Sequence, residues 1–128
     1  MSSVLLVDDD HAVREAIGRM LVLDGHSVNL ASDGASALAV LDGPRPDLIL
    51  LDLLMPTLNG QQLLAELQRR PECAGIPVVV LTGTIAREEE VRALGACGLL
   101  RKPVSYAELI HAVLELTAPH RRPGHTGE

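Results

Sequence analysis

Residues 4–10 read VLLVDDD, a short run of aliphatic residues that ends in three aspartates. A short apolar run bounded by polar residues is typical of a strand that is buried on both faces of a parallel sheet. Similar runs recur at residues 28–31, 48–51, 78–81 and 99–100. Each is bounded by Asp, Gly or Pro, which mark the ends of strands. The sequence therefore predicts five strands.

Stretches with a helical pattern separate the five runs. In three of them, residues 12–21, 37–41 and 63–67, apolar residues recur at steps of three or four, the period of an α-helix with one buried face. A fourth, polar helix is expected at residues 86–93, and a fifth is expected to begin at Ser105. Strands that alternate with helices predict a doubly wound α/β domain, a five-stranded parallel sheet with helices on both faces.

Two of the predicted helices begin with residues that suit a helix N-terminus. Asp10 precedes the first helix, where its side chain is expected to accept a hydrogen bond from an otherwise unpaired backbone N–H. Ser105 with Glu108 three residues later predicts a capping box. Both helix caps are structural features, and neither has a catalytic role.

The composition narrows the possible functions. The chain has 128 residues, which suits one domain, and a formal net charge of −6, which disfavours direct nucleic-acid binding. Tyr106 is its only aromatic residue, so no surface for stacking bases is expected. No apolar run approaches the roughly 18–20 residues that cross a membrane. We expect a cytoplasmic domain at residues 1–118 without membrane insertion, and a disordered tail at 119–128, which lacks apolar periodicity.

The two cysteines, Cys73 and Cys97, have no metal-type spacing. Free, buried thiols are the expected state of both, since free Cys commonly behaves as a small apolar residue. This expectation agrees with a reduced, cytoplasmic setting.

Polar residues follow four of the five predicted strands. Because the carboxyl ends of parallel strands lie at one edge of the sheet, these residues are expected to converge there. Taken singly, each has a structural explanation, such as a helix cap or a turn, but their joint placement favours a site. The four groups are Asp8 to Asp10, then Asp52, Thr82, and Lys102 with Pro103.

Several carboxylates at one edge of the sheet need a cation. Without one they repel each other, which raises the pKa of at least one carboxyl or destabilises the fold. Mg²⁺ suits the set because it prefers oxygen and typically uses one or two carboxylates plus waters and phosphate oxygens. The five histidines are scattered without i, i+4 pairing, so a zinc site has little support.

Four motifs occur in order and with suitable gaps: VDDD at 7–10, DLLMP at 52–56 with Gly60, LTG at 81–83 and KP at 102–103. Over about residues 3–117 they resemble the receiver domain of bacterial response regulators, the phosphoacceptor half of two-component signalling. The resemblance is to receivers of the chemotaxis-regulator kind. It implies a flavodoxin-like strand order of 2-1-3-4-5.

The resemblance implies that Asp52 is the phosphoacceptor. It also implies that Asp9, Asp52 and the backbone carbonyl of Leu54 hold Mg²⁺. Asp8 is expected to assist, through a metal-bound water. These four residues form the predicted metal site.

Thr82 and Lys102 are the other expected members of the site. The resemblance implies that Thr82 donates its hydroxyl to a phosphoryl oxygen in the active state and that Lys102 brings a positive charge to the same group. The Lys102–Pro103 peptide bond is expected to be cis. Leu99 departs from the pattern, since many receivers carry there an aromatic residue that rotates inward on activation.

The implied function is a switch. A sensor histidine kinase or a histidine phosphotransfer protein donates the phosphoryl group. The domain then regulates a downstream partner or output domain through the surface of the helix at 86–93, the strand at 99–100 and the last helix. The chain is not expected to be a turnover enzyme, beyond self-phosphotransfer and autodephosphorylation.

Two alternative functions stay open. A receiver fold can serve as a phosphorylation-independent interaction scaffold, although the acidic, Thr and Lys positions are all retained. A Mg²⁺-dependent phosphohydrolase would use Asp52 as its nucleophile. Such a site normally has a second carboxylate two residues later, where Leu54 stands.

Overall fold

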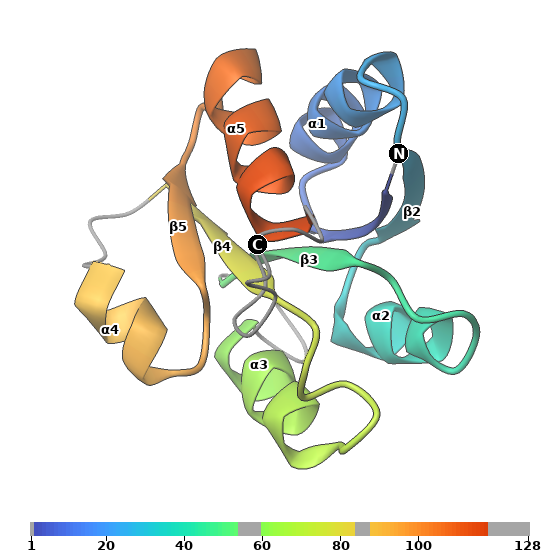
Figure 1. Ribbon diagram of the computed structural model, residues 1–128, viewed down its shortest axis with the longest axis vertical. Coiled ribbons are helices and arrows are strands. Elements are labelled where there is room, and N and C mark those ends of the chain that lie inside the picture. The colour runs from blue at the N-terminus through green and yellow to red at the C-terminus, as the bar shows by residue number, and fades with distance from the viewer. Residues whose placement is uncertain (1, 54–59, 84–87, 118–128) are drawn as a thin grey trace, which may run out of the picture.

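Five parallel strands form one sheet in the order β2-β1-β3-β4-β5 (Figure 1). The computed structural model describes residues 2–53, 60–83 and 88–117. Each strand extends the predicted run by one residue at one end or at both. The strands are β1 (Ser3–Val7), β2 (Ser27–Ala31), β3 (Leu48–Asp52), β4 (Val78–Thr82) and β5 (Gly98–Arg101). The predicted fold and strand order are confirmed.

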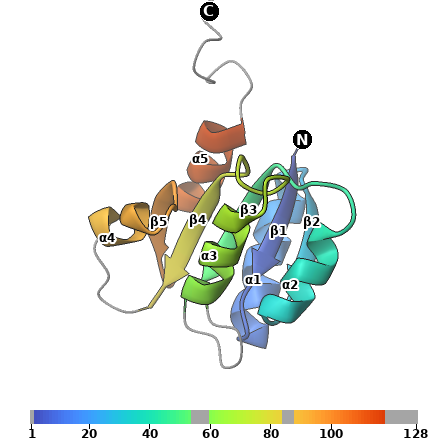
Figure 2. The ribbon, with the colours of Figure 1, turned by 90° about the horizontal axis from the view of Figure 1, so that it is seen from below.

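The helices cover both faces of this sheet. Figures 1 and 2 show α1 and α5 on one face and α2 and α3 on the other. All five predicted helices are present, although residues 86–87 of the fourth prediction lie outside the described residues. The helices are α1 (His11–Leu23), α2 (Gly34–Leu41), α3 (Gly60–Arg69), α4 (Glu88–Ala93) and α5 (Tyr106–Thr117).

Alternating strand residues build two separate cores, because successive side chains of a strand point to opposite faces. Leu6 and Leu50 pack with α1 and α5, whereas Leu5 and Leu51 pack with α2, α3 and α4. All residues of β3 and β4 are buried. Strands β2 and β5 are largely exposed or half-buried because each has a neighbour on only one side. The predicted burial on both faces therefore holds for the inner strands.

Asp10 and Ser105 cap α1 and α5 as predicted, but the Glu108 carboxylate is bonded to the Ser105 hydroxyl, where the predicted capping box had the Ser105 backbone N–H. Asp10 accepts hydrogen bonds from the backbone nitrogens of Ala12 and Val13, at 2.9 and 3.2 Å. The Ser105 hydroxyl accepts one from the backbone nitrogen of Glu108 at 3.1 Å and lies at the same distance from the Glu108 carboxylate. These contacts hold the first turns of α1 and α5.

The remaining predictions about the chain have mixed outcomes. Both cysteines are free, but only Cys73 is buried, and burial raises the pKa of its thiol. Cys97 is half-buried because it precedes the edge strand β5. The predicted tail at 119–128 lies outside the described residues. In the part of the chain that the structure describes, no helix combines the length and apolar character of a membrane span.

Candidate functional site

The inner strands bring the predicted site residues to one edge of the sheet. Strand pairing aligns Val7 with Leu51 and Asp52 with Leu81, so β1, β3 and β4 end side by side. Asp52 and Thr82 are the last residues of their strands, whereas the prediction placed them just beyond the strand ends. Asp8 directly follows β1.

Burial singles out these residues from the rest of the domain. Asp8, Asp52 and Thr82 are only 0%, 5% and 2% exposed. Within the described ranges, they are the only polar or charged residues that are buried. Polar groups are costly to bury without partners, so their concentration at one edge indicates a binding site.

Three carboxylates meet at this edge. Asp8, Asp9 and Asp52 each place a carboxylate oxygen within 4.8 Å of the other two. Asp9 is exposed, so the cluster opens to solvent on that side. The predicted convergence of these side chains is therefore present.

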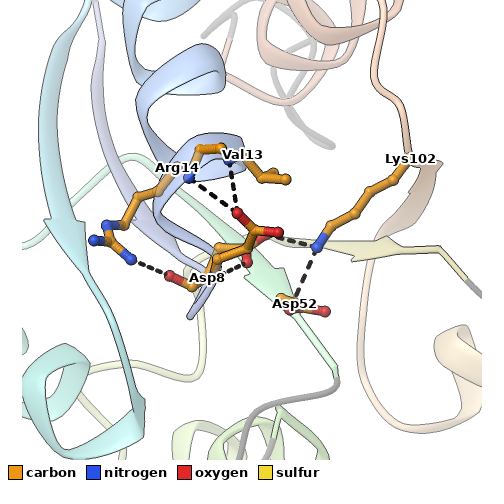
Figure 3. Close-up of polar contacts among 7 residues, drawn as sticks. Asp8, Val13, Arg14, Asp52 and Lys102 are labelled. Carbon is orange, nitrogen blue, oxygen red and sulfur yellow. Dashed lines mark hydrogen bonds and ion pairs between the residues drawn. The ribbon is translucent and has the colours of Figure 1, made fainter.

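Lys102 lies opposite the carboxylates (Figure 3). Its Nζ is 2.8 Å from Oδ2 of Asp8 and 3.4 Å from Oδ2 of Asp52. Burial lowers the pKa of Lys102, but the two carboxylates outweigh burial and hold the pKa above its usual value. The ammonium is therefore charged at neutral pH. Its backbone nitrogen donates to the carbonyl of Thr82 at 2.8 Å, and the Lys102–Pro103 peptide bond is cis, as expected.

The donor set fits a hard divalent cation. All three clustered side chains offer carboxylate oxygens, the ligands that Mg²⁺ prefers. Asp8 Oδ2 is buried, and among the described residues its only partner is the Lys102 ammonium. One ammonium also leaves the charge of three carboxylates only partly balanced. The carbonyl of Leu54, the remaining predicted ligand, lies outside the described residues.

Arg14 is a neighbour of the site that the sequence did not reveal. Its Nη1 donates to the backbone carbonyl of Asp8 at 2.8 Å (Figure 3). The available signal was its place in the first turn of α1, just after the acidic run. Leu99, which stands where many receivers have an aromatic residue, is half-buried against the core formed with α2, α3 and α4.

Comparison with known proteins identifies the family to which this chain belongs. A family model described as the response regulator receiver domain matches residues 4–114. The chain belongs to the response regulator receiver family. The predicted resemblance to receiver domains is thereby confirmed.

Two of the proteins similar to this chain are response regulators named MprA. Response regulator MprA of Mycobacterium sp. (strain KMS) is 39% identical over 125 residues, which cover 94% of this chain and 54% of MprA. MprA of Mycolicibacterium vanbaalenii is 40% identical over 121 residues, 91% of this chain and 52% of that protein. The receiver domain thus spans about half the length of the curated relatives it matches.

Solved structures show the same fold. Chemotaxis protein CheY4 of Vibrio cholerae is 30% identical with a TM-score of 0.84, over 91% of this chain and 98% of CheY4. The Mn²⁺-bound form of response regulator Rcp1 is 28% identical with a TM-score of 0.79, over 93% and 96% of the two chains.

Replacing Lys102 with Met is expected to destabilise the metal-free receiver domain by about 2 kcal/mol. Breaking a buried ion pair costs roughly 3–5 kcal/mol, and we discount this figure because the Lys102 side chain is 19% exposed. Urea denaturation in EDTA measures the loss. Mg²⁺ should stabilise the variant more than the unaltered domain, because the cation can replace the missing positive charge. Equal stability of the two proteins in EDTA would contradict this role of the ammonium.

Proposed function

We propose that this receiver domain accepts a phosphoryl group on Asp52 and changes its protein contacts in response. The observation that carries the proposal is the meeting of three carboxylates with Lys102 at one edge of the sheet. Asp9, Asp52 and the Leu54 carbonyl would hold Mg²⁺, with Asp8 assisting. When bound, Mg²⁺ neutralises the carboxylates and the oxygens of the incoming phosphoryl group.

The residues at the site suit phosphoryl transfer. An oxygen of the Asp52 carboxylate forms a bond to phosphorus while the bond from phosphorus to the donor histidine nitrogen breaks, and the electron pair leaves with the imidazole. The transferred group carries negative charge that is spread over its oxygens, so catalysis consists mostly of positioning and electrostatic stabilisation. Lys102 supplies a positive charge, and Thr82 donates its hydroxyl to a phosphoryl oxygen.

Phosphorylation would shift the domain between two conformations. Thr82 ends β4, and its carbonyl is hydrogen-bonded to the backbone of Lys102 just beyond β5. A contact from Thr82 to the new phosphoryl oxygens would therefore favour one packing of these two strand ends. The result is a population shift, so we do not propose turnover of a substrate.

The partners follow from the same proposal. The phosphoryl donor would be a sensor histidine kinase or a histidine phosphotransfer protein. The response would be read by a downstream protein or output domain on the surface of α4, β5 and α5. A cavity of about 280 Å³ lies there, and residues of all three elements line it, among them Arg92, Leu99, Leu100, His111 and Glu115. A cytoplasmic location stays a prediction.

Acetyl phosphate with Mg²⁺ tests the proposal directly. We expect a mass gain of one phosphoryl group per chain, measured on the intact protein, and none when EDTA removes the cation. Beryllofluoride with Mg²⁺ should bind with the same stoichiometry. Continuous release of phosphate from many substrates would instead support the phosphohydrolase, and no response to either reagent would support the scaffold.

A further inference from the structure

Arg14 contacts the acidic turn from the side of α1. Its Nη1 donates to the Asp8 carbonyl at 2.8 Å, and its Nη2 lies 3.2 Å from Nδ1 of His11. A guanidinium has donors only, so Nδ1 of His11 must be the acceptor of this second bond. The guanidinium is thereby held between a ring nitrogen and a backbone carbonyl.

The hydrogen bond from Arg14 adds to several other contacts that hold Asp8 in place. The backbone nitrogen of Asp8 donates to the Ala31 carbonyl at 3.1 Å, and Oδ1 accepts from the Asp10 nitrogen at 2.9 Å. Oδ2 pairs with Lys102 at 2.8 Å. The carbonyl that Arg14 holds is buried, since Asp8 is 0% exposed. A buried carbonyl without a partner is unfavourable, so the turn depends on this bond.

The held carbonyl belongs to the peptide unit that joins Asp8 to Asp9. A peptide unit is planar, so fixing its carbonyl also fixes the direction of the following N–Cα bond. The orientation of this plane therefore determines the position of the Asp9 Cα atom, from which the side chain extends. Without the restraint, repulsion among the three carboxylates favours a turn that moves Asp9 away from Asp52.

We propose that Arg14 is a positioning residue for the cation site. By holding the Asp8 carbonyl it keeps the carboxylates of Asp8 and Asp9 directed toward Asp52. The inference rests on the proposed function, because it assumes that these carboxylates bind a divalent cation. The inference concerns how the ligands are oriented. Groups that hydrogen-bond to metal ligands without touching the metal have a similar role.

The charge of Arg14 and its hydrogen bond have opposite effects on cation binding. If Arg14 acted only as a nearby positive charge, its removal would reduce repulsion and tighten the binding of a divalent cation. If it positions the ligands, its removal loosens the turn and weakens binding. The sign of the change therefore distinguishes the two roles.

The test is titration with Mn²⁺, followed by the electron paramagnetic resonance signal of the free ion. We expect Arg14→Gln to raise the dissociation constant for Mn²⁺ about ten-fold. Losing a group that orients metal ligands typically weakens metal binding by at least about this factor. Arg19→Gln is the matched control, because it removes the same charge from the same helix at an exposed position. It should bind Mn²⁺ no more weakly than the unaltered domain. Arg14→Lys, with one ammonium that cannot make both contacts, should lie in between.

The possible results separate this inference from the proposed function. Failure of the unaltered domain to bind Mn²⁺ would overturn both. Binding by the unaltered domain together with equal or tighter binding by Arg14→Gln would overturn the positioning role alone. Far-UV circular dichroism shows whether each variant folds. If Arg14→Gln does not fold, Arg14→Lys decides: weaker binding supports the role, and unchanged binding contradicts it.

Discussion

Asp52→Asn is expected to abolish the mass gain from acetyl phosphate completely. The amide has nearly the same shape as the carboxylate but lacks the anionic oxygen that attacks phosphorus. Asp52 is buried at the end of β3, and it lies next to Lys102. Removing one of three converging carboxylates also reduces their repulsion, so the variant should stay folded. Intact-mass spectrometry with and without Mg²⁺ measures the effect.

Asp10→Asn is the matched control for this substitution. It removes the same charge two residues beyond Asp8, and asparagine caps a helix about as well as aspartate. Because Asp10 caps α1 and does not belong to the three-carboxylate cluster, the variant should still gain one phosphoryl group. A mass gain in Asp52→Asn equal to that of the unaltered domain would disprove the role of Asp52.

Gly60→Ala is expected to destabilise the domain by about 3 kcal/mol or more, at the upper end of the cost of overpacking. A Cβ atom at Gly60 would lie 2.3 Å from both the Asp52 carbonyl oxygen and the Leu53 Cα. Both are backbone atoms, so no side-chain rotation relieves the clash. The nitrogen of Gly60 also donates to the Leu53 carbonyl at 3.0 Å, which holds the start of α3 against the end of β3. The clash should therefore also displace Asp52 and weaken its phosphorylation.

Gly83→Ala is the control for this prediction. Gly83 follows Thr82 at the same edge of the sheet, but a Cβ there meets no atom within 4 Å. We expect stability close to that of the unaltered domain. Urea denaturation of the three proteins measures the difference, and a Gly60→Ala variant as stable as Gly83→Ala would show that the backbone can move apart at this point.

Local pattern determined the order of strands and helices along this chain, whereas the strand order in the sheet followed from the family resemblance. Each strand is a short aliphatic run, and the helices at 12–21, 37–41 and 63–67 carry a periodic apolar face, so the order of elements can be read without knowing the contacts. The predicted boundaries were short by about one residue at strand ends. In β3 and β4 the reason is that Asp52 and Thr82 are polar yet pair with the neighbouring strand. The exposure of β2 and β5 depends on their place at the sheet edges, which apolar content does not encode.

The sequence by itself also determined which residues gather at the site, since parallel strands with polar ends must present those ends together. Only the tertiary structure decided how they are held. The contact of Arg14 with the Asp8 carbonyl, the approach of Gly60 to the backbone at Asp52, and the pairing of Lys102 with two carboxylates join atoms from separate elements. Such contacts depend on where whole helices and strands pack, and no local period or motif specifies that distance.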